Sequence, residues 1–196
     1  MAYRTILLLA TAAIGLAGCG SKTAEDQAAD TQPTFHEVMT QQIDARADDV
    51  WAIGNAAIAD TAGLDPALLD DASWDKLAAG ALALQQGADT IAKMDPIVVA
   101  RPGVKILDEG VENGSSAAEV QRNIDAEPDT LREMADVLAS HAGDLAKAAK
   151  AHDAATAGPL INQLDGVCES CHLEFWYPEQ KDLVKAIIAR DATPAK

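Results

Sequence analysis

The sequence predicts an all-α protein, an antiparallel four-helix bundle, and three observations support this fold class. Apolar residues recur at helical spacing along most of the 196-residue chain. Strand signals are weak, because Ile97-Val98-Val99 is the only β-branched run and prolines bracket it. The connections between the helical segments are short apart from a single long one, which suits antiparallel neighbours.

Each expected helix has a start signal. The clearest is Thr34-x-x-Glu37, which has the form of a capping box. Pro128 is a favourable residue for a first helical turn. In chain order, the four helices are expected to begin at Thr34, near Ser73, near Pro128, and between Asp153 and Pro159.

Each helix also has an apolar face, which we expect to form the core of the bundle. The expected inward residues, helix by helix, are Val38, Met39, Ile43, Val50, Ile53, Gly54 and Ala57; Trp74, Leu77, Ala81, Leu84, Ala88 and Ile91; Leu131, Met134, Leu138, Leu145 and Ala148; and Leu160, Leu164, Val167, Cys168, Cys171 and Phe175.

The long connection, residues 95–127, is rich in glycine and is expected to contain a short helix opened by Ser116 and Glu119.

The N-terminus reads as a targeting segment. Arg4 precedes an apolar run, Ile6–Leu16, of the length typical of a secretory signal peptide. The run is too short for a transmembrane helix, which needs about 20 apolar residues. Leu16-Ala17-Gly18-Cys19 ends the run and resembles the lipobox of bacterial lipoproteins, in which cleavage precedes a cysteine that is then acylated. An ordinary signal peptide followed by an unrelated cysteine is the alternative.

These features divide the chain into three parts. Residues 1–18 are the expected signal peptide, and residues 19–33, which lack apolar periodicity, are a flexible tether. Residues 34–196 form the bundle. The mature protein is then anchored to a membrane through a lipid on Cys19, on the periplasmic side. Gly20 stands where lipoproteins retained at the inner membrane commonly have aspartate, so the resemblance favours the outer membrane.

The chain is strongly acidic, with a formal net charge of -16. Removal of residues 1–18 takes away Arg4 and no acidic residue, so the mature chain is more negative still. Binding to nucleic acid through basic patches is therefore excluded as a function. A redox partner with a basic docking surface is expected, because complementary charge speeds encounter. A surface that only keeps the protein soluble is the alternative.

The motif with the clearest chemistry is Cys168-Glu169-Ser170-Cys171-His172, which matches the C-x-x-C-H signature of covalent haem c attachment. Two thiols three residues apart can add to the two vinyl groups of one haem, and the adjacent imidazole can reach the iron. On a helix, Cys168, Cys171 and His172 lie on one side. We therefore expect one covalent haem c held by these three residues.

Other chemistries for the cysteines are less consistent with the sequence. A thioredoxin-like C-x-x-C needs a βαβ setting, which the sequence does not show. A structural zinc site needs four ligands, and no second Cys or Cys/His pair is present. A disulfide between Cys168 and Cys171 would leave His172 unexplained. With Cys19 acylated and two cysteines on haem, no free thiol remains in an oxidising compartment.

A C-x-x-C-H motif on the last helix of a four-helix bundle resembles the cytochrome c-prime family, the class II c-type cytochromes. The resemblance covers roughly residues 34–177. It implies either a five-coordinate haem that binds small gases or a six-coordinate haem that transfers electrons. The Met-ligated relatives carry their axial methionine early in the first helix, where this chain has Met39. Family members often dimerise through the first two helices, so a homodimer is possible.

The sixth ligand of the iron decides the function. Met39 is the leading candidate, by its family position, although a Met on an apolar helix face is usually core filler. Its ligation would give a low-spin iron suited to electron transfer. The alternatives for the ligand are Met94, Met134 and His36; His141 reads as a core or haem-edge residue and His152 as a solvated one.

One departure from the family also bears on the function. Gas-binding relatives commonly have an aromatic and then an arginine at the third and fourth positions after the haem histidine. Phe175 matches the first, but Trp176 replaces the arginine. This favours an electron carrier with an apolar proximal side and a raised potential. We expect no enzymatic activity; a nitric oxide or carbon monoxide binder is the alternative, and a peroxidase would need His36 or His141 as its acid/base.

Overall fold

The computed structural model describes residues 31–58, 63–112 and 114–191. The predicted signal peptide, Cys19 and most of the tether lie outside these residues. Within the described residues the protein is α-helical, and its strand-like pairing is one isolated bridge between Ile58 and Leu64. The prediction of an all-α fold is therefore confirmed.

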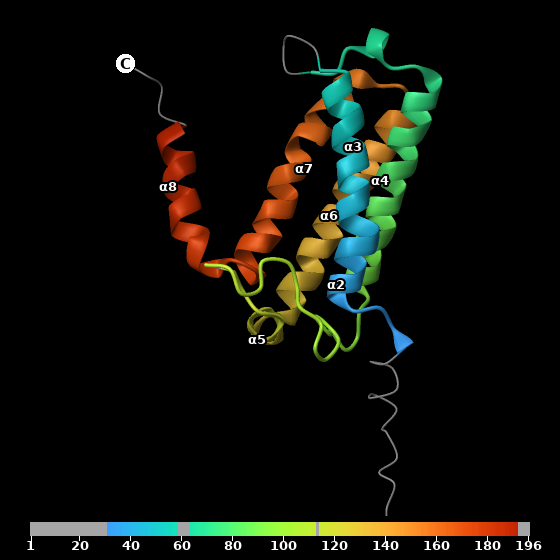
Figure 1. Cartoon of the computed structure of the whole chain (residues 1–196). Coiled ribbons are helices and arrows are strands. Elements are labelled where there is room, and N and C mark those ends of the chain that lie inside the picture. Colours follow the sequence, from blue (N-terminus) through green and yellow to red (C-terminus); the bar gives the residue numbers. More distant parts are fainter. Residues whose placement is uncertain (1–30, 59–62, 113, 192–196) are drawn as a thin grey trace, which may run out of the picture.

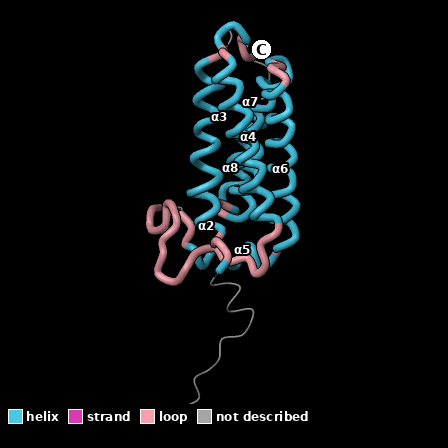
Figure 2. Tube along the Cα trace, turned by 90° about the vertical axis from the view of Figure 1, so that its right-hand side faces the viewer, coloured by secondary structure: helices cyan, strands magenta, loops and turns pink. Residues whose placement is uncertain are grey.

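The long helices form the bundle. The first is continuous from Phe35 to Ala56 and consists of α2 (Phe35–Val38), a π-helical turn η1 (Met39–Ile43) and α3 (Asp44–Ala56). It is followed by α4 (Asp71–Ala92), α6 (Pro128–Lys150) and α7 (Ala154–Phe175). Figure 1 shows these helices side by side with alternating directions, and Figure 2 shows the same bundle from a second side.

Shorter elements connect and extend the bundle. The 3-10 turn η2 (Pro66–Leu68) precedes α4, and α5 (Ala117–Ala126) crosses the end of the bundle where α2 begins (Figure 1). The 3-10 turn η3 (Pro178–Gln180) leads from α7 into α8 (Lys181–Asp191). Helix α8 was not foreseen from the sequence. It stands beside the bundle in Figure 1, and its Leu183 and Ile188 are more than half exposed.

The helix starts follow from local capping chemistry. Ser116 and Glu119 form the predicted capping box of α5, and Thr34 and Glu37 form that of α2. The second long helix begins two residues earlier than Ser73, at Asp71, because the carboxylate of Asp70 accepts hydrogen bonds from Ser73. Ser73 is therefore the partner of the cap rather than the cap.

The core lies between facing apolar stripes of the long helices. Fully buried leucines such as Leu77, Leu84 and Leu145 each stabilise the fold by about 1.5–3 kcal/mol. Small residues let the backbones approach closely. At Gly80 of α4, an added Cβ would come within 3.3 Å of Val50 on α3. No helix in the described part of the chain is long and apolar enough to cross a membrane.

The long connection after α4 closes the end of the bundle at which α2 begins. The carbonyls of Val98 and Val99 accept hydrogen bonds from the backbone amides of Phe35 and His36, at 2.8 and 2.9 Å. These amides belong to the first turn of α2 and have no partner within the helix. The β-branched run Ile97-Val98-Val99 thus supplies acceptors to a helix N-terminus instead of forming a strand.

The carboxylate of Glu37 links α2 to the residue that caps it and to the long connection. It accepts from the amide of Thr34 at 2.8 Å, and Arg101 of the long connection lies 3.1 Å away. These hydrogen bonds, from Thr34 first and then from Arg101, hold the pKa of Glu37 below its ordinary value of 4.5. The ionised carboxylate therefore stabilises the folded state above that value, and the stabilisation is lost as pH falls through the lower, folded-state pKa.

We predict that Glu37→Gln lowers the free energy of unfolding at pH 7, and that the difference from wild type disappears in acid, below the folded-state pKa of Glu37. Denaturant titrations at several pH values measure this difference. The matched control is Glu119→Gln, which removes the carboxylate in the corresponding capping position of α5. The basic partner of Glu119, Arg122, lies 3.9 Å away, farther than Arg101 lies from Glu37. A stability loss in Glu37→Gln that is independent of pH would contradict the assignment.

Candidate functional site

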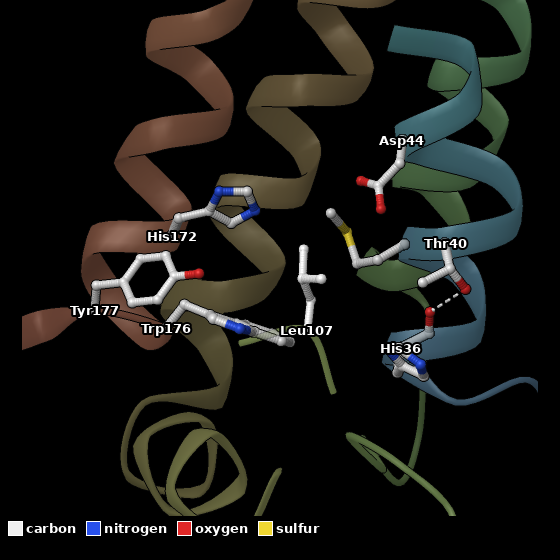
Figure 3. Close-up of a pocket in the computed structure, with 8 residues that line it drawn as sticks. His36, Thr40, Asp44, Leu107, His172, Trp176 and Tyr177 are labelled. Carbon is white, nitrogen blue, oxygen red and sulfur yellow. Dashed lines mark hydrogen bonds between the residues drawn. The ribbon is translucent and has the colours of Figure 1, made fainter. Parts of the chain in front are cut away.

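The candidate site is a pocket between the start of the first helix and the end of α7. His36, Met39, Thr40 and Asp44 line it from the first helix, and His172, Trp176 and Tyr177 line it from α7 and the turn that follows. Leu107, from the long connection, completes the lining. Figure 3 shows Leu107 between the two groups, with His172 on one side and His36 on the other.

A second, more apolar cavity adjoins this pocket and shares Met39 and His172 with it. Its lining includes both motif cysteines, Cys168 and Cys171, on α7. Its remaining walls come from all the long helices of the bundle, through Phe35, Ile43, Ile91, Leu131, Met134, Ala135, Leu138 and Val167.

The C-x-x-C-H motif lies within α7, and its helical spacing orients its residues. Cys168, Cys171 and His172 face the cavity, whereas Glu169 and Ser170 are exposed. The two cysteines are not joined in a disulfide. The two thiols and the imidazole needed for haem c attachment therefore lie on one wall of one apolar cavity.

The surroundings of the two thiols keep them protonated. Burial, with a smaller contribution from Asp165, raises the pKa of Cys168 to about 11. Burial and the neighbouring Cys168 raise the pKa of Cys171 to about 12. A thiol with a raised pKa is a weak nucleophile at neutral pH. The pocket therefore does not have the electrostatics of a thiol-based catalytic site.

The end of α7 is held in place through its last carbonyl groups. The amide of Asn123 on α5 donates to the carbonyl of Phe175 at 2.8 Å, and the hydroxyl of Ser115 donates to that of Trp176 at 2.6 Å. These contacts satisfy acceptors that a helix C-terminus leaves without partners. They also fix the backbone just after His172.

Trp176 provides an aromatic wall next to His172. It is nearly buried, and its ring centroid lies 5.7 Å from that of Phe35 and 6.3 Å from that of His172. The position after Phe175, where gas-binding relatives commonly have arginine, is thus filled by an aromatic ring that lies near both Phe35 and His172. Phe175, the preceding residue, is buried in the core.

The other methionines and histidines considered from the sequence lie in several parts of the bundle. His36 lines the pocket, and Met134 lines the apolar cavity. Met94 is buried but lines neither. His141 is partly buried, and its Nε2 atom lies 2.8 Å from the carbonyl oxygen of Leu160. The ring of His152 stacks on Trp74 at the other end of the bundle, with centroids 5.2 Å apart.

Four pocket residues were not identified from the sequence: Thr40, Asp44, Leu107 and Tyr177. Partial burial raises the pKa of Asp44, and the nearby His172 opposes this shift. The hydroxyl of Tyr177 donates to the carboxylate of Asp108 at 3.1 Å. Asp44 lies among exposed polar residues of its helix, and Leu107 lies in a connection without periodicity, so neither carries a sequence signal.

The donor set fits haem c. The cavity is lined by apolar side chains, as a porphyrin requires. It holds two thiols and an imidazole at the attachment spacing, and a thioether from the facing helix. Among the described residues there is no cluster of three or more His, Cys, Asp or Glu side chains that could hold a separate metal ion. An apolar pocket of this kind at one end of a helical bundle defines the site of a haem protein.

The comparison with protein families agrees with this class. The model of the family described as Cytochrome C' matches residues 75–176, which is more than half of the chain. The chain therefore belongs to the cytochrome c-prime family, a family of haem c-binding cytochromes. The matched residues include the C-x-x-C-H motif and end at Trp176, and they begin after Met39. Searches of curated proteins and of solved structures gave no match.

We predict that Cys168 and Cys171 of the haem-free folded chain react slowly with iodoacetamide. At pH 8, the raised pKa of Cys168 leaves about 100-fold less thiolate than an ordinary cysteine has. Mass spectrometry of quenched samples gives the rate, and the same chain in denaturant is the control. Equal rates in the folded and the denatured chain would contradict the burial of these thiols.

Proposed function

We propose that this protein is a lipid-anchored electron carrier with one covalent haem c. Cys168 and Cys171 form the two thioether bonds, and His172 and Met39 are the axial ligands. The observation that carries this proposal is the presence of His172 and Met39, from different helices, in the lining of one pocket.

The bound haem would supply a one-electron Fe(III)/Fe(II) couple, whose potential depends on the axial ligands and on the polarity around them. The chain's own residues set those conditions. Phe35, Ile43, Leu131 and Leu138 exclude water from the cavity. Trp176 keeps a charged side chain away from His172. A neutral thioether and an apolar shell both favour the ferrous state, which carries less charge, and so raise the potential.

A gas-binding protein is the second candidate, because the family match does not extend to Met39. In that case Met39 would not coordinate, and the iron would stay open to nitric oxide or carbon monoxide. A peroxidase is less well supported. Of its two possible acid/base residues, His36 lines the pocket, but His141 contacts the carbonyl of Leu160 instead.

The anchor is part of the same proposal. The lipobox-like sequence before Cys19 supports acylation of that cysteine, and residues 19–33 would act as the tether. Residues 31–33, the last of the proposed tether, directly precede α2 (Figure 1), and His36 and Met39 near the start of the same helix line the pocket. The anchor would therefore attach at the haem end of the molecule, on the periplasmic side and preferably at the outer membrane.

The surroundings of the pocket suit a partner with a basic docking surface. Leu107 at the mouth is 73% exposed. Asp108, Glu169 and Glu179 act electrostatically on Tyr177, and Asp48 acts on Asp44. A pocket lined by an exposed apolar residue, with carboxylates acting on two of its other lining residues, is complementary to a redox protein whose own apolar contact is surrounded by lysines.

The axial ligand has a spectroscopic test. We predict that the purified protein is low-spin in both oxidation states, and that its ferric form shows the weak red band of thioether–iron coordination. Met39→Ala should be high-spin and bind carbon monoxide. The controls are Met134→Ala, in the same cavity, and Met94→Ala, outside it. Both should stay low-spin. A wild-type protein that is high-spin and binds carbon monoxide fully would favour gas binding instead.

The covalent groups have a test by intact mass. Protein extracted from membranes and denatured should begin at Cys19, carry acyl chains on it, and retain one haem. Cys19→Ser should keep the haem and lose membrane association, because acylation needs the thiol. A mature terminus elsewhere, without lipid, would refute the anchor; loss of haem on denaturation would refute the thioether bonds.

The docking surface has a kinetic test with a cationic oxidant of high potential, tris(1,10-phenanthroline)cobalt(III). We predict that the double variant Asp48→Lys/Glu179→Lys is oxidised about 10-fold more slowly than wild type at low salt. Salt of about 1 M should remove the difference. Asp71→Lys/Asp75→Lys, in the first turns of α4 at the end of the bundle away from the pocket, also replaces two carboxylates by two lysines (Figure 1). An equal slowing in Asp71→Lys/Asp75→Lys would mean that only the net charge matters.

A further inference from the structure

Helix α8 has an apolar face that the described part of the chain leaves largely uncovered. Leu183, Ile187 and Ile188 are 62%, 41% and 63% exposed, and Val184 belongs to the same face. The spacing of these four residues is that of an apolar stripe along one side of a helix. The main neighbour of α8 is the turn η3, and Figure 1 shows the helix standing away from the long helices.

An ion pair holds the base of α8 against the bundle. The Nζ atom of Lys181 lies 2.6 Å from Oε1 of Glu174, near the end of α7. Lys181 is the first residue of α8, so the rest of the helix and its apolar stripe extend beyond this contact. Exposed apolar faces of folded proteins mark sites of protein or membrane interaction. The stripe is therefore a candidate interaction surface.

The charge of this segment is opposite to that of the rest of the chain. Residues 181–196 contain four basic and two acidic residues, which gives a formal charge of +2. Residues 1–180 contain eleven basic and 29 acidic residues, which gives a formal charge of -18. A negatively charged surface that repels the bundle therefore does not repel α8.

The basic residues of α8 lie along the edges of the apolar stripe. At about 100° per residue, Lys181 and Lys185 border one edge and Arg190 borders the other. Of the two acidic residues, Asp182 lies on the opposite side of the helix, and Asp191 is its last residue. Lysine and arginine beside an apolar face are typical of a helix that lies in the surface of a bilayer.

Protein partners fit this face less well. A second copy of the chain could pair through α8, but each helix of 11 residues is only about 16 Å long. Such a pair buries much less than the 800 Å² or so that each partner buries in a stable complex. A redox partner with a basic surface would be repelled by the basic edges of the stripe. Anionic phospholipid headgroups are attracted to them instead.

The proposed lipid anchor would keep α8 close to a membrane. The 15 residues from Cys19 to Pro33 separate the anchor from the bundle. A random-coil chain of this length spans about 20 Å on average. That distance is shorter than α7, whose 22 residues measure about 33 Å. An anchored bundle, and α8 with it, therefore lies within reach of the bilayer.

We propose that α8 is a membrane-surface helix that inserts its apolar stripe among the headgroups of an anionic phospholipid bilayer. For its location, this inference rests on the proposed lipid anchor. A single weak membrane contact gives marginal, reversible binding, whereas two together give stable attachment. By itself α8 is therefore released when membranes are washed, as expected of Cys19→Ser. Tyr177 of the pocket precedes α8 by four residues, so the second contact also limits how the pocket is oriented toward the membrane.

The test uses the haem protein without its anchor, so that the outcome does not depend on the lipid. The chain from Gly20 on is exported behind an ordinary signal peptide and mixed with sucrose-loaded vesicles. These contain phosphatidylcholine and about 30% phosphatidylglycerol. Sedimentation separates bound from free protein, and gel densitometry measures both. Salt of about 0.1 M screens the repulsion between the vesicle and the acidic bundle beyond about 10 Å.

A triple variant removes the apolar stripe and keeps the helix. Leu183→Ala/Ile187→Ala/Ile188→Ala, the stripe variant, deletes the exposed apolar side chains of α8. Alanine is the best helix former, so α8 is preserved, and far-UV circular dichroism checks this.

The matched control removes the same amount of apolar surface elsewhere. Ile58→Ala/Leu68→Ala/Val137→Ala, the control variant, deletes three apolar side chains that are 54%, 58% and 58% exposed. None of these residues belongs to α8, and each substitution also places alanine at a surface position.

We expect the native chain and the control variant to bind the anionic vesicles, and to bind vesicles of pure phosphatidylcholine more weakly. The stripe variant should bind at least about 10-fold more weakly than the control variant, because it inserts fewer methylene groups. The inference is overturned if the native chain does not bind, if the two variants bind equally, or if phosphatidylglycerol does not strengthen binding. A native chain that ignores vesicles but forms a dimer, lost in the stripe variant, would assign α8 to a second copy.

This result is separable from that of the anchor. Acyl chains on Cys19 without vesicle binding by the unanchored chain would leave the anchor standing and refute the role of α8. Vesicle binding through the stripe, with an unmodified mature terminus in the native protein, would refute the anchor and leave the role of α8 standing.

Discussion

The alternation of helix directions is the constraint on which the rest of the structure depends. Because the first helix and α7 run in opposite directions, the first turns of one and the last turns of the other meet at the same end of the bundle (Figure 1). Met39 and His172 are 133 positions apart in the chain and still line one pocket. The long connection and α5 then close that end through hydrogen bonds to α2 and α7.

The same end of the molecule combines an apolar interior with an acidic exterior. Apolar side chains line the cavity around the motif, and Trp176 gives the imidazole of His172 an aromatic neighbour. Outside, the carboxylates of Asp108, Glu169 and Glu179 act electrostatically on Tyr177, which lines the pocket together with the exposed Leu107. Such a division suits a redox centre that is shielded from water but must be approached by a charged partner. It is less suited to chemistry that needs an activated thiol or a polar cavity.

Much of the fold and part of the site could be predicted from the sequence. The 3.6-residue periodicity located the long helices, and Thr34 and Ser116 marked two capped starts, because these signals are local. The C-x-x-C-H spacing identified one wall of the pocket for the same reason. Asp44, Leu107 and Tyr177 could not be found, since their place in the pocket depends on how distant segments pack. The π turn η1 corresponds to a feature of the apolar spacing, the five-residue step from Val38 to Ile43. Ordinary helical patterns do not include this step.

The central claim is the bond between Met39 and the iron, and proton NMR of the reduced protein tests it most directly. A methionine that coordinates a diamagnetic ferrous haem places its methyl group over the porphyrin, where the ring current shifts the resonance far upfield. The sequence has four methionines, and three of them, Met39, Met94 and Met134, belong to the proposed mature chain. The account predicts one far-upfield methyl resonance that is lost in Met39→Ala. Ordinary positions for all three methyl groups would contradict it.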